Sequence, residues 1–513
     1  MAQPLVVTPS ALTRDDVVSV ARQWRTVVVD ATTVASMQAT RDVVERLAAQ
    51  PEPVYGVSTG FGALATRHVP PELRDRLQVS LIRSHAAGSG QPVEVEVVRA
   101  MMVLRLRTLA SGATGVRPEV AETLAALLNA GITPVVSEYG SLGCSGDLAP
   151  LATVALAMLG EGQVEDRGMR CSAHEALAHH GIAPLVLQAK EGLGLINGTE
   201  GMLGMLLLAG HDLERLLRLA DVAAAMTIEA LLGTDRAFDA DLMAMRPQVG
   251  QQDSAANLRT LLADSEIVAS HADPAVDARV QDAYSLRCSP QVHGAARDTL
   301  AFTQAIADRE LSAAIDNPVV TPDGRVASNG NFHGAPVAHS LDFLAIVAAD
   351  VASIAERRTD RLLDATRSHG LPAFLAHDPG VDSGHMIAQY TAAGIVSEMK
   401  RLAAPASVDS IPSSALQEDH VSMGWAAARK LRRSVDGLAR VLAIEIVTAA
   451  RALDLRAPLR PGVGTGAALA AVRDVVEGPG PDRHVAPEIQ AVVDLALSAT
   501  LLDRVEAATG PLA

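Results

Sequence analysis

Apolar residues recur at helical spacing along most of this 513-residue chain. With 3.6 residues per turn, such spacing places them on one face of a helix, and it predicts long helices over 95–109, 213–232, 341–363 and 421–455. Alternation with a period of two, typical of half-buried strands, is confined to the short segments 26–29 and 318–326. Strands and helices do not alternate, so a parallel α/β sheet is not predicted. We predict a mainly α fold in which the long helices form a central bundle.

Loops rich in glycine and polar residues lie between these helices, and they hold most of the rare aromatic side chains. Three of the four tyrosines, Tyr55, Tyr139 and Tyr284, lie in such loops, as does Phe332. Binding groups are often carried by loops on a rigid scaffold, so this placement predicts a site. Aromatic rings that only wedge the loops against the core would give the same pattern. We expect residues 1–200 to form a smaller part carrying the active-site loops and residues 201–513 to form the bundle and a C-terminal helical part, together one functional unit.

Composition and charge narrow the function classes. Hydrophobic residues make up 49% of the chain and charged residues 20%, which is typical of a globular protein. A net charge of −16 without a basic patch makes nucleic acid and anionic membranes poor partners, and a small molecule fits better. We find no signal peptide pattern and no uncharged apolar run of about 18 residues. Because the three cysteines form no CxxC pair, we predict neither a disulfide framework nor a structural zinc site, and we expect no metal. A reducing compartment is the simplest home for such a chain, so we also predict a cytoplasmic location.

The segment 140–150, GSLGCSGDLAP, carries the most unusual chemistry in the chain. Three of its first seven residues are glycine, which predicts a tight turn, and an apolar helical stretch follows it. Asp147 suits a helix N-cap or first turn, and Pro150 is tolerated in a first turn. The tripeptide Cys144-Ser145-Gly146 should therefore lie at a helix N-terminus.

This tripeptide could cyclise without help. The amide nitrogen of Gly146 has no Cβ beside it, so it can attack the carbonyl carbon of Cys144, and loss of water gives an imidazolone. Loss of the Ser145 hydroxyl as a second water leaves an exocyclic methylene, which makes a conjugated electrophile. A helix N-terminus would favour negative charge on such a ring. A phosphate-binding loop is disfavoured because no lysine is present, but a plain glycine-rich helix entry stays open from this segment alone.

The wider sequence resembles the aromatic amino acid ammonia-lyase and aminomutase family, whose prosthetic group is this methylidene-imidazolone. Most members have alanine where this chain has Cys144. Within the family the chain looks most similar to histidine ammonia-lyases of the actinobacterial type. Besides GSLGCSGDLAPLA, the resemblance is carried by YGVSTGFG (55–62), SHAAG (84–88), KEGLGLINGT (190–199), QDAYSLRC (281–288), DNP (316–318), SNGNFHG (328–334), ERR (356–358), MIAQ (386–389) and QEDHVSM (417–423).

The resemblance implies roles for individual residues. Tyr55 matches the tyrosine proposed to remove the β-proton of the substrate. A phenol has a pKa of about 10, so we expect a helix dipole or a cationic neighbour to lower the pKa of Tyr55. Arg287 matches the arginine that holds the substrate carboxylate, for which its planar fork is suited. The remaining matches contact the prosthetic group or line the cavity, and they are Asn197, Gln281, Tyr284 and Phe332.

Two residues bear on the substrate. Glu418 matches a glutamate of the histidine lyases, where a carboxylate can pair with an imidazole N–H. His85 matches a ring-contacting histidine, which tyrosine lyases share. The resemblance thus implies non-oxidative deamination of L-histidine to trans-urocanate and ammonia in a homotetramer whose sites are shared between subunits, with no added cofactor. The alternatives are a tyrosine or phenylalanine ammonia-lyase, or a 2,3-aminomutase, of the same family.

Four residues depart from the family pattern. Ser80 stands where asparagine is usual, and Thr153 replaces histidine after APL. Leu416 replaces asparagine before QED, and His385 stands where an apolar residue is expected. None of these changes removes a catalytic group, but Ser80 and His385 bear on fine substrate preference.

Other enzyme classes have weaker support. The segment 56–60 fits the G-x-S-x-G pattern of serine hydrolases and the segment 397–400 fits S-x-x-K, but neither has its required context. His174 and Glu175 begin a pattern like the H-E-x-x-H of zinc enzymes. The next histidine, His179, lies about 140° around a helix from His174, so the two would not share a face. A non-catalytic helical scaffold would explain the helices but not the rare residues in the loops.

Overall fold

The computed structural model describes residues 3–50, 54–60, 62–273, 275–277, 279–321 and 323–513, and it is mainly α-helical. The chain folds into two compact units. Unit 1 comprises Met1–Leu208, Gln304–Asp342 and Pro405–Arg429, and unit 2 comprises Ala209–Thr303, Phe343–Ala404 and Lys430–Ala513. The predicted mainly α fold is confirmed.

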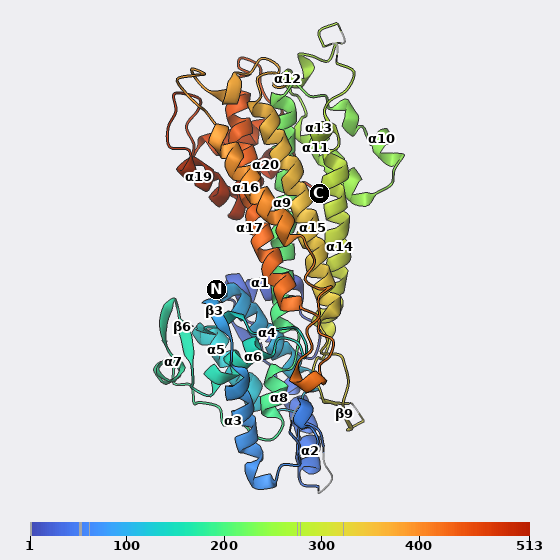
Figure 1. Ribbon diagram of the computed structural model, residues 1–513, viewed down its shortest axis with the longest axis vertical. Helices are drawn as coiled ribbons and strands as arrows, with labels where there is room; N and C mark the ends of the chain where they lie inside the picture. Colours follow the sequence, from blue (N-terminus) through green and yellow to red (C-terminus); the bar gives the residue numbers. More distant parts are fainter. Residues whose placement is uncertain (1–2, 51–53, 61, 274, 278, 322) are drawn as a thin grey trace. The chain divides into compact units, whose positions relative to one another are not determined.

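The helices and strands of unit 1 form a helical core edged by short sheets (Figure 1). Its helices are α1 (Arg14–Arg22), α2 (Ala31–Ala48), α3 (Arg74–His85), α4 (Val95–Ala110), α5 (Pro118–Ala130), α6 (Leu148–Met158), α7 (Ala173–His179) and α8 (Glu191–Ile196). Its strands are β1 (Leu5–Val7), β2 (Val27–Val29), β3 (Ser89–Pro92), β4 (Ile132–Pro134), β5 (Ser137–Tyr139), β6 (Gln163–Asp166), β7 (Met169–Ser172), β8 (Val319–Val320) and β9 (Val326–Ala327). Strand β1 pairs with β2 in parallel, whereas β3–β5, β4–β6–β7 and β8–β9 pair antiparallel.

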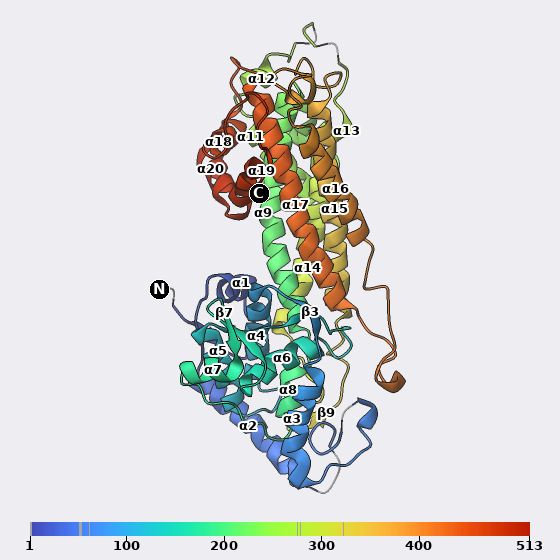
Figure 2. The same cartoon turned by 60° about the vertical axis from the view of Figure 1, so that its left-hand side comes forward.

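Unit 2 is built on long helices that run side by side in both ribbon views (Figures 1 and 2). Four helices have residues in both units: α9 (Glu200–Ala230), α14 (Ser289–Ser312), α15 (Ala335–Leu363) and α17 (Gly424–Asp454). The others are α10 (Ala240–Ala244), α11 (Val249–Leu261), α12 (Glu266–Ala269), α13 (Tyr284–Arg287), α16 (Met386–Leu402), α18 (Val463–Arg473), α19 (Ala486–Leu497) and α20 (Thr500–Thr509). Single 3₁₀ turns complete the list: η1 (Gly62–Leu64), η2 (Pro71–Leu73), η3 (Arg236–Phe238), η4 (Ala373–Leu375) and η5 (Ser414–Leu416).

The helices predicted from apolar spacing are confirmed as α4, the C-terminal part of α9, α15 and α17. Strand 26–29 is confirmed as β2, but the prediction of one strand over 318–326 is wrong. That segment forms a hairpin, because Gly324 adopts a φ of +80° and the chain turns back so that Val320 pairs with Val326. Residue 322 lies outside the described residues.

The core of unit 2 contains a buried ion pair between two long helices. Arg358 on α15 and Glu445 on α17 are both fully buried, and the Arg358 Nη2 to Glu445 Oε2 distance is 2.9 Å. Thr227 on α9 donates a further hydrogen bond of 2.9 Å to Glu445. A buried charge is tolerated only when it is paired, so this contact fixes the register of α9, α15 and α17.

Among the described residues, one helix, α15, is long and apolar enough to cross a membrane by composition alone. Within its most apolar window, 61% of the residues are buried inside the protein. Burial of this kind is found in the core helices of globular units, so the helix is weak support for a membrane span.

Candidate active site

The loop carrying Cys144-Ser145-Gly146 is clamped between two other segments of unit 1. Gly146 has a φ of +72° and forms a parallel bridge with Gly198, and a Cβ at Gly146 would lie 1.9 Å from the Gly198 carbonyl oxygen. On the other side, Ser422 Oγ donates a 2.9 Å hydrogen bond to the Gly143 carbonyl, where a Cβ would lie 2.2 Å from that hydroxyl. The backbone therefore admits only glycine at Gly143 and Gly146.

Asp147 links this loop to a second helix. It occupies the N-cap position of α6, as predicted, but its side chain makes no capping hydrogen bond there. Its carboxylate instead accepts the Met202 backbone N–H at 2.8 Å, near the start of α9, and the Ser141 hydroxyl at 2.9 Å. The side chain thus caps α9 rather than α6, and complete burial raises the pKa of Asp147 to about 7.

Cys144 and Glu418 come together although 274 positions separate them in the sequence. The Cys144 thiol is mostly buried and hydrogen-bonds to the Glu418 carboxylate. Burial first, and the Glu418 charge second, raise the pKa of Cys144 to about 12. The Ser413 hydroxyl donates a 2.8 Å hydrogen bond to Glu418 Oε2, and the two backbones pair as an antiparallel bridge. The thiol therefore stays protonated, and Glu418 is held beside the loop that carries Ser145.

Tyr55 lies near the same carboxylate. The Gly62 backbone N–H donates to the Tyr55 hydroxyl at 3.4 Å, and a Cβ at Gly62 would lie 2.7 Å from the Ser414 hydroxyl. Burial raises the pKa of Tyr55, the Gly62 N–H lowers it, and the charges of Glu418 and Asp316 raise it further. The prediction that a helix dipole or a cationic neighbour lowers the pKa of Tyr55 is therefore wrong, because the surrounding groups raise that pKa. Phe61 of the same motif lies outside the described residues.

His85 is the last residue of helix α3, and it lies close enough to Glu418 for the carboxylate charge to affect its pKa. Its Nδ1 lies 2.9 Å from the Leu81 carbonyl oxygen, which can only accept, so Nδ1 carries the proton and Nε2 has the free lone pair. Burial lowers the pKa of His85, while the hydrogen bond to Leu81 and the charge of Glu418 oppose that effect. Burial therefore disfavours the charged form of His85, and its Nε2 is the ring nitrogen that can accept a hydrogen bond.

Asn197 lies at the C-terminal end of helix α8, next to Gly198, which pairs with Gly146. It is almost fully buried, and its Nδ2 donates to the Asn317 carbonyl at 3.0 Å and to Asp316 Oδ1 at 3.4 Å. Its Oδ1 is buried without a hydrogen-bond partner. Asp316 also forms a fully buried ion pair with Lys190 at 2.6 Å. The unpaired amide oxygen is an acceptor available to a group absent from the structure.

Three of the predicted residues belong to unit 2. Gln281 and Tyr284 are exposed, with Tyr284 72% exposed, and Arg287 is half-buried at the end of α13. The Arg287 guanidinium lies 4.8 Å from the centre of the Tyr284 ring, and its Nε has no hydrogen-bond partner. Phe332 belongs to unit 1, where it is half-buried in the turn before α15. The structure thus groups Tyr55, His85, Cys144, Asn197 and Glu418 within one unit.

The four residues that depart from the family pattern lie in different surroundings. Ser80 is exposed on α3, and Leu416 is exposed in η5 with a φ of +68°. Thr153 donates to the Ala149 carbonyl within α6 at 2.9 Å. His385 is buried at the start of α16 with its Nδ1 3.1 Å from the Thr448 hydroxyl, and burial lowers the pKa of His385 to about 4.

Some contributors to the site were not assigned roles from the sequence. Lys190, Asp316 and Ser422 lie in quoted motifs, and Ser413 lies outside them. The usable signal was a charged residue within a glycine- and asparagine-rich loop, as in KEGLGLINGT and DNP. Pairing between these loops depends on the tertiary fold, so a single sequence does not reveal it.

Comparison with known proteins identifies the family of this chain. Residues 12–474 match the family model described as aromatic amino acid lyase.

The chain belongs to the aromatic amino acid lyase family.

Similar proteins extend over the whole chain. The chain is 61% identical to a histidine ammonia-lyase of Streptomyces coelicolor over 510 residues, which cover 99% of each chain. A solved histidine ammonia-lyase from Trypanosoma cruzi is 38% identical with a TM-score of 0.91, covering 99% of this chain and 96% of that one. A tyrosine aminomutase from Streptomyces globisporus is also 38% identical, with a TM-score of 0.95 and full coverage of both chains. The family fold is therefore shared by lyases and aminomutases with different named substrates.

Proposed function

We propose that this aromatic amino acid lyase removes ammonia from L-histidine to give trans-urocanate. The main support for this proposal is the position of Glu418, which is hydrogen-bonded to Cys144 and lies close to Tyr55 and His85. A carboxylate at this place can accept an imidazole N–H from a substrate, whereas a phenyl ring offers no such donor. The 61% identity to proteins named histidine ammonia-lyase supports the same substrate.

The residues of the loop fit a methylidene-imidazolone made from Cys144-Ser145-Gly146. Gly146 adopts a backbone conformation that only glycine tolerates, the loop is clamped from both sides, and Asn197 Oδ1 is a buried acceptor without a partner. When formed, this group supplies an electrophile that turns the substrate's amine into a good leaving group. Asp147, by joining the loop to the start of α9, holds the tripeptide in one conformation.

The protein's side chains orient the substrate and move its proton. In this proposal, Tyr55 removes a proton from the β-carbon, while Glu418 accepts the imidazole N–H and fixes the ring. Arg287 binds the carboxylate through its two-pronged guanidinium. Orientation of this kind can lower a barrier by several kcal/mol.

Replacing Glu418 by Gln tests the substrate. The amide keeps the size of the side chain but removes the charge that accepts the imidazole N–H, at a cost of about 1.5–3 kcal/mol in the complex with histidine. We expect kcat/KM for histidine to fall by roughly tenfold to a hundredfold, with a much smaller change for residual phenylalanine turnover. Asp419→Asn, at the exposed neighbouring position, is the matched control. An equal loss for both substrates would place Glu418 in the shared machinery and leave specificity to His85.

Replacing Arg287 by Lys tests the carboxylate contact. One ammonium cannot reproduce two parallel hydrogen bonds, so we expect KM to rise for every amino acid turned over. Losing one charge-assisted hydrogen bond costs about 1.5–3 kcal/mol. Steady-state kinetics would show the change mainly in KM. Unchanged kinetics toward all substrates would mean that Arg287 does not bind the carboxylate.

A tyrosine or phenylalanine lyase, or a 2,3-aminomutase, is the second candidate. It is favoured by one observation, the equal identity of the chain to the solved histidine lyase and tyrosine aminomutase. His85 does not separate the candidates, because it can contact either ring. Glu418 favours the histidine lyase. A non-catalytic scaffold gives no reason for the grouped Tyr55, Cys144 and Glu418.

We further propose a cytoplasmic homotetramer in which Gln281, Tyr284 and Arg287 of one subunit serve a site of another. Exposed aromatic rings support an assembly surface on unit 2, where Phe302 and Phe343 lie 6.4 Å apart between ring centres. Burying such rings between subunits is favourable. Light scattering at micromolar concentration should give four times the chain mass. An active monomer would contradict the shared site.

A further inference from the structure

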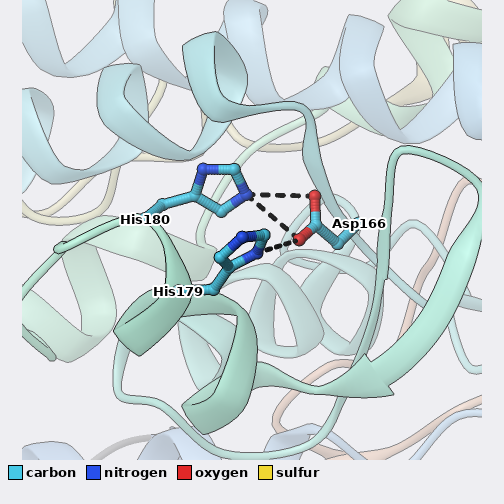
Figure 3. Close-up of side chains that lie close together, drawn as sticks. All are labelled: Asp166, His179 and His180. Carbon is cyan, nitrogen blue, oxygen red and sulfur yellow. Dashed lines mark hydrogen bonds and ion pairs between the residues drawn. The ribbon is translucent and has the colours of Figure 1, made fainter.

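A second cluster of ionisable side chains lies in unit 1, and it contains none of the residues of the candidate active site. Asp166 ends strand β6, His179 ends helix α7, and His180 follows it. Figure 3 shows both imidazole rings turned toward the Asp166 carboxylate. His180 Nε2 lies 3.0 and 3.1 Å from the two carboxylate oxygens, and His179 Nδ1 lies 3.3 Å from one of them.

The cluster combines a buried anchor with an open face. Asp166 is 7% exposed. The side chain of His180 is 18% exposed and that of His179 is 74% exposed. Solvent can therefore reach one side of the cluster, while the carboxylate is held from within the protein.

The surrounding backbone brings these three residues together without any added group. Strand β6 pairs with β4 on one side and with β7 on the other, which fixes Asp166 at the end of a three-stranded sheet. Helix α7 starts with a complete capping box, in which Ser172 and Glu175 each accept a backbone N–H of the other. A site preorganised in this way pays little ordering entropy when an ion binds.

We propose that Asp166, His179 and His180 bind one divalent transition-metal ion, with Zn²⁺ as the ion that fits best. Ligand atoms in a tetrahedral zinc site lie about 3.3 Å apart, given bonds of about 2.0–2.1 Å. The histidine nitrogens lie 3.0 to 3.3 Å from the carboxylate, and all three ligand atoms lie within 4.8 Å of one another. Rotation of the exposed His179 ring can close the remaining gap, and water can take the fourth position.

The donor set selects among cations. Two imidazole nitrogens and one carboxylate suit Zn²⁺, Cu²⁺ or Ni²⁺, whereas Mg²⁺ and Ca²⁺ prefer oxygen ligands. Binding requires the neutral tautomers that leave lone pairs on His179 Nδ1 and His180 Nε2, and their other ring nitrogens can keep the proton. The ion would tie the end of α7 to the end of β6. This cluster is independent of the proposed reaction, so the ion should affect stability rather than turnover.

Titration of tag-free, chelator-treated full-length protein with ZnCl₂ tests the site. Calorimetry should show one Zn²⁺ per chain, and the Tm should rise with Zn²⁺ but not with MgCl₂. In His179→Ala and in His180→Ala the Kd should increase by at least about tenfold, since even a group that only orients a metal ligand is worth that much. His174→Ala is the matched control, because His174 is an exposed histidine on the same helix outside the cluster. Its Zn²⁺ binding should equal that of the parent.

Two results would overturn the proposal. One is the absence of saturable Zn²⁺ binding to the parent protein. The other is a Kd that stays the same in His179→Ala and His180→Ala, which would place the bound ion elsewhere. Because His179 is exposed, His179→Ala tests the site even if changes at the buried Asp166 disturb folding. Amino-acid turnover by these variants should match the parent, which separates this test from those of the proposed function.

Discussion

Ser145→Ala should fold like the parent and lose nearly all activity, with kcat falling by roughly a thousandfold or more, or at least about 4 kcal/mol of added barrier. Alanine has no hydroxyl to lose, so no exocyclic methylene can form and the substrate's amine stays a poor leaving group. The side chain is only half-buried, and the loop is fixed by Gly146, Gly143 and Asp147 rather than by Ser145. The unfolding free energy should therefore change little.

Intact mass distinguishes this cause from a general disturbance of the loop. The parent should weigh less than its sequence mass by two water molecules, one from ring closure and one from Ser145. Ser145→Ala can lose at most the water of ring closure. Ser141→Ala is a control in the same loop, since it removes a hydroxyl that contacts Asp147 but cannot form the methylene. Full activity in Ser145→Ala would refute the mechanism.

Tyr55→Phe should lower kcat by about a hundred- to ten-thousandfold, the range for loss of a general base. The ring and its packing remain, and the hydrogen bond lost among the described residues is the long one from the Gly62 N–H, so the Tm should change little. Burial and the charges of Glu418 and Asp316 raise the pKa of Tyr55. The active phenolate therefore becomes more populated as pH rises, and kcat of the parent should increase with pH on the alkaline side of neutrality.

The pH profile gives Tyr55→Phe a readout that a structural role would not move. The residual activity of the variant should lose the increase of kcat with pH. Tyr390→Phe, at an exposed position on α16, is a control for the loss of a tyrosine hydroxyl. If Tyr55→Phe keeps the parent's kcat and pH profile, another group removes the β-proton.

Helices and tight turns were predictable from the sequence because their causes are local. Apolar spacing alone predicts α4, α15 and α17, because the apolar side of each helix has to be buried against other elements. The tight turn at 140–146 could also be predicted, because three glycines in seven residues are typical of one. The hairpin at 319–327 was missed, since a short apolar run does not reveal a reversal at Gly324.

Contacts between segments that are distant in the chain could not be predicted from a single sequence. Asp147 reads as the cap of the helix that follows it, yet its carboxylate caps α9, because the fold brings Met202 within 2.8 Å. From the sequence, His174 and His179 are the natural pair of metal ligands to compare, because they lie on one predicted helix. The actual neighbours of His179 are His180 and Asp166, and Asp166 comes from a strand. The family resemblance supplied Glu418, which no local pattern connects to Cys144.

The proposed reaction is tested most directly by product formation from L-histidine with the purified parent protein. With no nucleotide or added cofactor, we expect trans-urocanate and ammonia to appear in equal amounts, and histidine to be turned over faster than tyrosine or phenylalanine. Failure to form urocanate from histidine, or a higher kcat/KM for tyrosine or phenylalanine, would contradict it.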